Sequence, residues 1–163
     1  MPPAIDAIAS LRIRSGLSAF MKPLATHSEI AALCRFVRTA QIAYSQANKE
    51  TFLRETRRLA ARMARDLELE SGAFDIRVNP AGIGSSGDVT LHAEHLYVCL
   101  DAEIDFGRGR TFCFRGCRSR RDYTGLGNQW ALWDDLAHRY AQVIGAMRAA
   151  ENGNSAVICP WPN

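Results

Sequence analysis

The chain lacks several features that would assign a protein to a class at once. No apolar run among its 163 residues approaches the roughly 20 residues that a membrane-spanning helix needs. A secretory signal is not expected either, because Arg12, Arg14 and Gly16 interrupt the apolar stretch near the amino terminus. We therefore expect a protein of the reducing cytoplasm that does not contact a membrane.

Cysteine and charge are equally unspecific. The five cysteines are odd in number and irregularly spaced, which does not predict a disulfide framework. The net charge of +3 is too small to predict nucleic-acid binding by itself. Hydrophobic residues make up 47% and charged residues 23%, values typical of a globular protein. We expect one domain over residues 1–163, with residues 1–22 as a loosely attached arm and 151–163 as a tail.

The first half of the chain has the periodicity of helices. We expect a short helix over residues 5–13 and a second one that begins at Thr26, which has capping-box spacing to Glu29. A third helix is predicted over residues 49–67, with Asn48 as its N-cap. One face of that helix is apolar and includes Phe52, Thr56, Leu59, Ala60, Met63 and Leu67. The opposite face is basic and includes Arg54, Arg57, Arg58, Arg62 and Arg65.

The period changes to two after Gly72, which is typical of strands. Alternation runs over residues 74–78, again over 89–92, and without a break over 95–106. A turn at Ala93-Glu94 would pair Val89 with Val98 and Leu91 with Leu96. A three-residue turn at 107–109 would pair Ile104 with Phe112 and Ala102 with Phe114. Both registers keep apolar residues on one face.

Residues 118–128 are polar and contain glycine, so we expect a loop, followed by a helix over residues 131–150. Together these elements predict an α+β fold with an antiparallel sheet of about four strands and helices packed on one face.

The polar face of the sheet suggests two kinds of catalytic or metal site. His92-x-x-His95 with Cys113-x-x-x-Cys117 has the residue types of a zinc site. The predicted register argues against it, because Glu103 lies opposite Cys113 and His95 is then roughly 27 Å away along the strand. Accordingly, no metal and no cofactor is expected.

Acidic residues offer a second possibility on the same face. Asp101, Glu103 and Asp105 could form the site of an enzyme that depends on a divalent ion. The simpler interpretation is a solvated face whose acids pair with Arg110 and Arg115. A thiol nucleophile finds no basic partner near Cys99, and the glycine-rich loop 81–87 lacks the Lys-Ser/Thr ending of a phosphate loop.

The strongest polar signal is a cluster of arginines between Asp105 and Asp122, where no acidic residue interrupts them. Arginine matches phosphate geometry, and a neighbouring aromatic ring can stack on a base. We therefore expect a non-enzymatic binding protein that contacts nucleic acid or an acidic protein surface. The residues expected to make the contact are Arg108, Arg110, Arg115, Arg118, Arg120, Arg121, Tyr123 and Trp130. Two alternatives stay open: a protein-only interaction module, such as an inhibitor of a host defence system, and the carboxylate-based enzyme.

Two stretches resemble small uncharacterised accessory proteins of bacterial plasmids, phages and integrated elements. They are SGDVTLHAEHLYV, residues 86–98, and CRSRRDYTGLGNQW, residues 117–130. The resemblance implies a bacterial setting on a mobile element and implies no activity. The oligomeric state and the identity of the partner are left open by the sequence.

Overall fold

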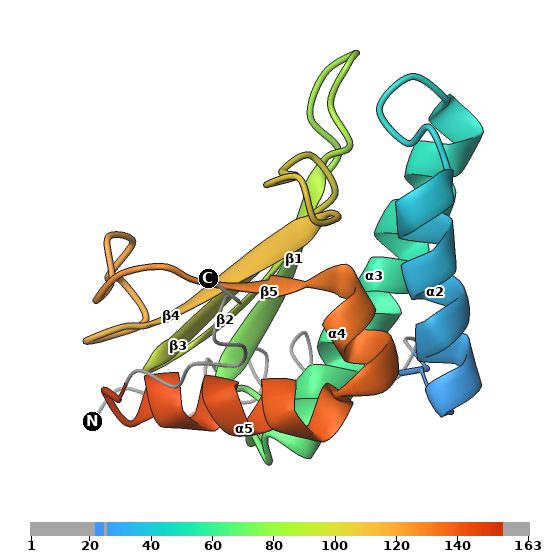
Figure 1. Cartoon of the computed structure of the whole chain (residues 1–163). Helices are drawn as coiled ribbons and strands as arrows, with labels where there is room; N and C mark the ends of the chain where they lie inside the picture. Colours follow the sequence, from blue (N-terminus) through green and yellow to red (C-terminus); the bar gives the residue numbers. More distant parts are fainter. Residues whose placement is uncertain (1–21, 25, 155–163) are drawn as a thin grey trace.

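A computed structural model describes residues 22–24 and 26–154 and contains a five-stranded antiparallel sheet (Figure 1). The strands follow one another in space in their order along the chain. They are β1 (Phe74–Asn79), β2 (Asp88–Ala93), β3 (Leu96–Asp101), β4 (Thr111–Gly116) and β5 (Gln129–Leu132). The helix expected over residues 5–13, nearly all of the expected arm and most of the expected tail lie outside the described residues.

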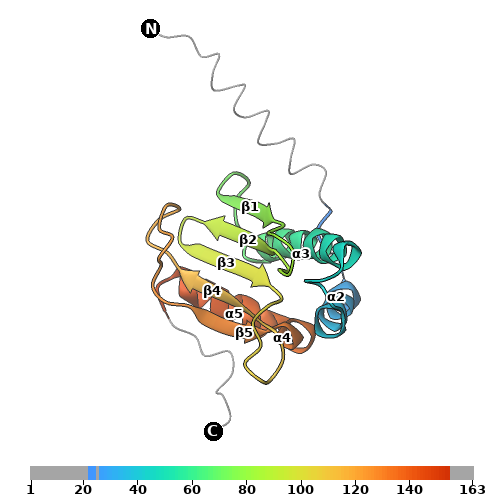
Figure 2. The same ribbon diagram turned by 90° about the horizontal axis from the view of Figure 1, so that it is seen from above.

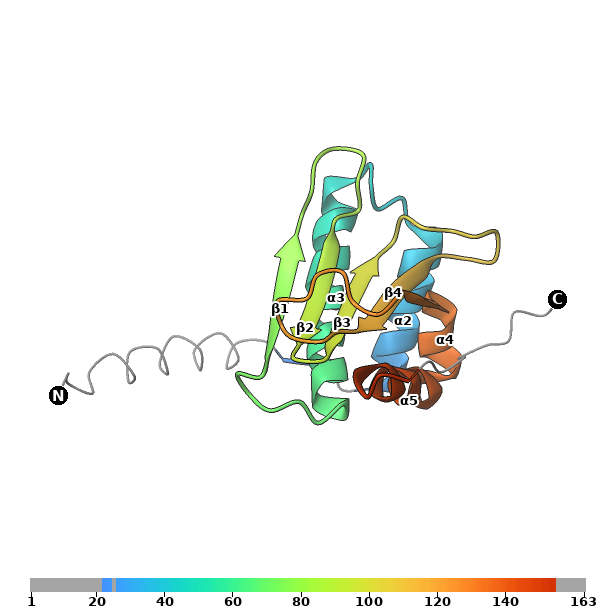
Figure 3. The ribbon, with the colours of Figure 1, turned by 90° about the vertical axis from the view of Figure 1, so that its left-hand side faces the viewer.

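Four helices lie on one side of this sheet (Figure 2). They are α2 (His27–Thr39), α3 (Gln46–Asp66), α4 (Trp133–His138) and α5 (Tyr140–Glu151). α3 packs on β1 and β2, α5 packs on β3 and β4, and α2 lies against α3 and α4. Among the residues that the structure describes, no helix lies in front of the other face of the sheet (Figure 3). The predicted α+β architecture is confirmed, with one strand more than expected.

The two helices of the first half form where the sequence predicts them. Thr26 and Glu29 make the expected capping box at the start of α2. α3 begins earlier than predicted, because Ser45 and not Asn48 is its N-cap: the Ser45 hydroxyl accepts the backbone N–H of Asn48 at 3.3 Å. Every residue predicted for the apolar face of α3 is buried in the core.

The first hairpin is shifted by two residues from the predicted register. Leu91 lies opposite Val98 and Val89 opposite Leu100, so the turn residues are Glu94 and His95 and not Ala93 and Glu94. A displacement of two residues leaves every side chain on its predicted face, because side chains alternate with a period of two. The face on which each side chain lies was therefore predicted correctly, whereas the cross-strand partners were not.

The prediction of one long strand over residues 95–106 is wrong in its second half. β3 ends at Asp101, and Val98 pairs with Phe114 where Ala102 was expected to. The backbone N–H of Ala102 instead donates to the Ser86 hydroxyl at 3.3 Å, and the Glu103 carboxylate accepts the backbone N–H of Ser86 at 2.7 Å. These bonds draw the chain toward the β1–β2 loop and out of the ladder. Residues 102–110 form a long β3–β4 loop.

The carboxyl-terminal helix is also shorter than predicted. Residues 129–132 pair with β4 as the fifth strand, and the helical segment that follows is broken at Arg139, whose φ of −141° and ψ of 38° are not helical. Trp133, at the start of α4, is 2% exposed and lies edge-on to Phe52 and Phe112 with ring centroids 5.9 and 5.7 Å away. It joins α3, α4 and β4 in one core. No helix within the described residues has the length and apolar character needed to cross a bilayer.

Candidate functional site

The face of the sheet that no helix covers presents two rows of mostly polar side chains. The strand pairings place Asp75, His92, Tyr97 and Arg115 side by side in the first row. The second row consists of Arg77, Thr90, Cys99, Cys113 and Trp130. We call this surface the open face. Its second row runs across all five strands.

The β4–β5 loop, residues 117–128, folds back over the first row of the open face (Figure 3). It reaches β1 through Arg120, whose guanidinium donates to the Gly72 carbonyl at 3.0 Å and pairs with the Asp75 carboxylate at 3.1 Å. Arg120 was predicted to contact a partner, and the structure shows that it ties this loop to the far edge of the sheet.

Asp122 gives the loop its shape from within. Its carboxylate accepts the backbone N–H groups of Arg118 at 3.0 Å, Gly125 at 2.9 Å and Thr124 at 3.2 Å. These hydrogen bonds hold the pKa of the Asp122 carboxyl well below its ordinary value. Sequence reasoning missed this residue, although an aspartate two positions before Thr-Gly is a common signal of a side-chain-to-backbone turn.

Arg115 anchors the loop from below. Its guanidinium donates to the Tyr123 carbonyl at 2.6 Å and to the Asn128 side-chain oxygen at 3.1 Å, and it lies 4.1 Å from the centroid of the Tyr97 ring. Gly125 packs directly on it in a left-handed conformation with φ +64°, where a Cβ atom would overlap the Arg115 side chain. The fork of Arg115 is thus engaged inside the protein.

Arg110 is separated from the other arginines. Its guanidinium donates to the carbonyls of Val37 at 2.6 Å and Ala40 at 3.3 Å, at the carboxyl end of α2. There it satisfies carbonyls that the helix leaves without partners. The reason is the alternation of β4: Arg110 has the same parity as Phe112 and Phe114, whose side chains face the helices. The predicted pairing of Arg110 and Arg115 with the acids of β3 is therefore wrong.

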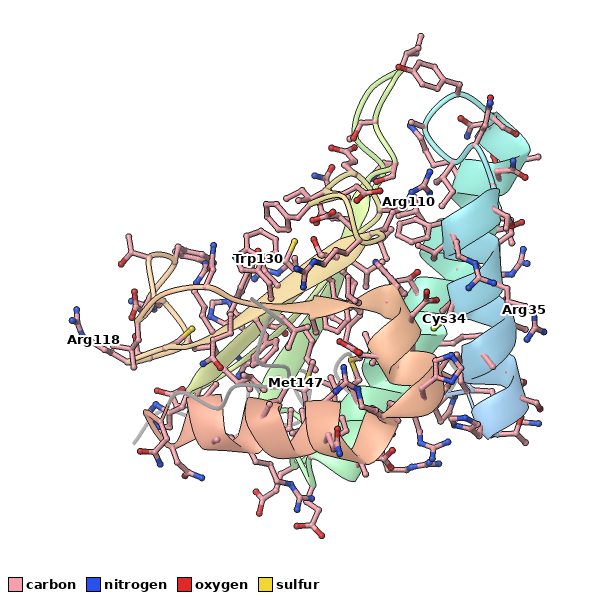
Figure 4. The ribbon with its side chains drawn as sticks, viewed as in Figure 1. Cys34, Arg35, Arg110, Arg118, Trp130 and Met147 are labelled. Carbon is pink, nitrogen blue, oxygen red and sulfur yellow. The ribbon has the colours of Figure 1, made fainter. Side chains whose placement is uncertain are left out.

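Three of the predicted arginines remain exposed, at two ends of the sheet. Arg118 and Arg121 lie on the β4–β5 loop, and Figure 4 shows Arg118 extending outward from its outer end. Neither side chain has a hydrogen bond or ion pair to any residue that the structure describes. Arg108 lies on the β3–β4 loop, at the other end of β4, and the length of that strand separates the two loops by roughly 17 Å.

Aromatic rings lie near both loops. Tyr123 is 62% exposed, and its ring rests edge-on against His92, which in turn contacts Tyr97, with centroids 5.5 and 5.3 Å apart. Trp130 contacts Phe106 at 5.4 Å on the second row, near the β3–β4 loop. Burial, together with Arg77, Arg115 and Arg120, lowers the pKa of His92, so this histidine is neutral at physiological pH.

The basic face of α3 does not extend this surface. α3 lies behind the sheet, on the side opposite the open face. Four of its five arginines are also paired with nearby carboxylates, in the pairs Arg54–Glu55, Arg58–Glu55, Arg62–Asp66 and Arg65–Asp66. The sheet therefore separates this helix face from the arginines of the β4–β5 loop.

The three acids proposed for an ion-dependent enzyme each hold a turn of the backbone. Asp101 accepts the backbone N–H of Glu103 at 3.1 Å, and Asp105 accepts that of Gly107 at 2.7 Å. Glu103 accepts the hydroxyl of Ser85 and the backbone N–H of Ser86, and these bonds lower its pKa. The end of β3 at Asp101 separates them, so they do not share one strand face as predicted.

The cysteines are arranged differently from the prediction. Cys99, and not Glu103, lies opposite Cys113, and His95 lies beside Cys117, whose backbone N–H donates to the His95 carbonyl at 2.9 Å. The predicted pairing of Glu103 with Cys113, from which the distance of His95 was derived, is therefore wrong. No group of three or more His, Cys, Asp or Glu side chains is arranged to hold a metal ion within residues 22–24 and 26–154.

Comparison with known proteins adds no assignment: no protein-family model, no curated protein and no solved structure matches this chain. The resemblance to accessory proteins of mobile elements therefore stays a prediction.

Proposed function

We propose that this protein binds single-stranded nucleic acid on the open face of the sheet, at the end formed by the β4–β5 loop. The observation that carries the proposal is the Tyr123 ring, which is 62% exposed and rests against His92. The same loop carries Arg118 and Arg121, whose guanidinium groups have no partner among the described residues. An aromatic ring that stacks on a base, next to arginines that bind phosphate, is the common arrangement of single-strand binding surfaces.

The rigidity of the loop supports this use. Asp122 and Arg115 fix the backbone on both sides of Tyr123 before any partner arrives. Binding therefore orders few side chains, which lowers its entropic cost. The open face also continues to Trp130, three strands away from His92 and so about 14 Å across the sheet, which offers a second ring along the path of a strand.

A single strand fits this surface better than a duplex. Base pairs in a duplex are stacked on one another and cannot place a face on Tyr123, whereas unpaired bases can. The acidic groups at the other end of the open face, Asp88 and Asp101, would repel phosphates there. We therefore expect a short site with about two phosphate contacts and weak dependence on base identity.

The first experiment is fluorescence anisotropy with short labelled single strands of DNA and RNA and with matched duplexes. About two phosphate contacts predict a slope of about −1.4 in log K against log salt, which is about a sevenfold loss of affinity between 50 and 200 mM salt. Single strands should bind and duplexes should bind more weakly.

Variants distinguish the contribution of base stacking to binding from the contribution of charge. Arg118→Ala with Arg121→Ala should lower affinity and flatten the salt dependence. Tyr123→Ala should cost about 1–3 kcal/mol of binding free energy, and Tyr123→Phe should retain most of the affinity because the ring remains. Arg54→Ala with Arg65→Ala makes the same change of charge on α3, behind the sheet, and should leave binding unchanged.

Failure of every oligonucleotide to bind at 50 mM salt would refute this proposal. The protein-only alternative would then be favoured, in which Arg118 and Arg121 bind an acidic surface of another protein. Location in a reducing cytoplasm, and a bacterial mobile element as the source, remain parts of the proposal that this assay does not address.

A further inference from the structure

The second row of the open face contains a pair of cysteines that the proposed function does not use. Cys99 on β3 and Cys113 on β4 are directly opposite partners in the ladder, and both are free thiols. Opposite residues of an antiparallel pair have Cα atoms about 4.5 or 5.5 Å apart, on the same face of the sheet. A disulfide spans about 4.4–6.8 Å between Cα atoms, so the spacing of this pair lies within the range of a disulfide.

The two thiols differ in exposure and act on each other. Cys113 is 7% exposed, whereas Cys99 is only half-buried. The hydrogen bond between the two side chains lowers the pKa of the Cys113 thiol and raises that of the Cys99 thiol. Because Cys99 is the more exposed of the two, it is the sulfur that a disulfide in solution can reach first.

The other described cysteines lack this arrangement. Cys34 is 1% exposed, donates to the Trp133 carbonyl at 3.0 Å, and has its pKa raised to about 12 by burial. Figure 4 shows Cys34 on α2, on the helical side of the molecule. Cys117 follows β4 and is not opposite another cysteine. The contrast makes Cys34 and Cys117 natural controls.

We propose that Cys99 and Cys113 form a reversible cross-strand disulfide by exchange with a low-molecular-weight disulfide such as oxidised glutathione. In the first step the Cys99 thiolate attacks one glutathione sulfur, forms a mixed disulfide and releases glutathione thiolate. In the second step Cys113 attacks the Cys99 sulfur, forms the protein disulfide and releases a second glutathione. The protein loses two hydrogens, and oxidised glutathione is reduced to two thiols.

The test is exposure of the full chain to oxidised glutathione, followed by intact mass and peptide mapping. The wild type should lose two hydrogens, and one peptide pair should be linked through Cys99 and Cys113. Addition of reduced glutathione in excess should reverse the change. Mapping of the wild type needs no substitution, so it stands even where a variant folds poorly.

Single variants should behave asymmetrically. Cys113→Ser should stop at the mixed disulfide and carry one glutathione on Cys99, because nothing resolves it. Cys99→Ser should stay largely unmodified at Cys113, because that sulfur is buried. Cys34→Ser and Cys117→Ser should each still form the cross-strand bond.

Three results would overturn the proposal. They are no linked peptide in the wild type, a link that includes a different cysteine, or equal glutathione addition in the two variants of the pair. Because no nucleic acid is present in this experiment, its outcome is independent of the binding proposal.

Discussion

Substitution of Arg115 tests whether this side chain holds the β4–β5 loop in place or is available to a partner. Its guanidinium spans the Tyr123 carbonyl, the Asn128 side chain and the Tyr97 ring. Arg115→Ala removes all three contacts at once. The loop then retains the bonds of Asp122 and the backbone bond from Leu126 to Gly116, but loses the side chain that fastens Tyr123 and Asn128 to β4.

The size of the effect can be worked from these contacts. Each hydrogen bond from a charged donor contributes about 1.5–3 kcal/mol, and a cation–π contact at a partly exposed site about 0.5–1 kcal/mol. Because Arg115 is partly exposed, water replaces much of what is lost, and we expect a net cost of about 2 kcal/mol. That corresponds to about a 30-fold increase in the population of the open loop.

Amide hydrogen exchange measures this opening directly. The backbone N–H of Leu126 donates to the Gly116 carbonyl at 3.0 Å and so joins the loop to β4. In Arg115→Ala its exchange should be about 30-fold faster, while amides of β2 and β3 should change far less. Arg115→Lys retains the charge but not the planar fork, so it should fall in between.

The control and the refuting result follow from the same loop. Arg121→Ala removes an exposed arginine whose side chain has no described partner, so Leu126 should exchange at the wild-type rate. Unchanged exchange at Leu126 in Arg115→Ala would show that Arg115 does not hold the loop. Arg115 would then return to the set of residues available for a partner.

Three further predictions concern the fold. Gly116→Ala should lower the free energy of unfolding by about 1–3 kcal/mol in urea titrations, because a Cβ atom there would overlap the Ala150 carbonyl oxygen of α5; a neutral result would contradict the close approach of α5 to β4. Leu100→Ala should cost about 2–5 kcal/mol because Leu100 is fully buried, and Ile104→Ala should cost clearly less because Ile104 is only half-buried beyond the end of β3; equal costs would support the longer strand. Burial lowers the pKa of His92 in the folded protein below its ordinary 6.5, so the unfolded chain binds a proton at His92 more tightly. The free energy of unfolding should therefore be highest above pH 6.5 and fall as the pH drops through the pKa that His92 has in the folded protein. His92→Asn should flatten that part of the stability curve, and an unchanged curve would assign the effect to another group.

The sequence was sufficient for the faces of the elements. Alternation with a period of two placed Val89, Leu91 and Val98 on the buried side, where all three are fully buried. Helical periodicity likewise identified the core face of α3. These patterns are local, because each depends on which side of a single strand or helix meets the core.

Local patterns could not determine which residues meet across strands. A shift of the first hairpin by two residues, and of the second by four, preserves every face, so alternation alone cannot detect either. The tertiary structure decided the second register, because Glu103 and Ala102 bond to the β1–β2 loop and end β3 at Asp101. That ending brings Cys99, and not Glu103, opposite Cys113.

The same distinction applies to the arginines. The sequence showed that they gather between Asp105 and Asp122, and alternation along β4 already separates Arg110 from Arg115 by face. Only the folded chain showed that Arg110 reaches the end of α2 and that Arg120 reaches Asp75 on β1, more than forty positions away along the chain. The sequence determined where the positive charge lies along the chain, whereas long-range contacts determined which guanidinium groups are left for a partner. A guanidinium that is already bonded within the protein must lose those bonds before it can bind anything else.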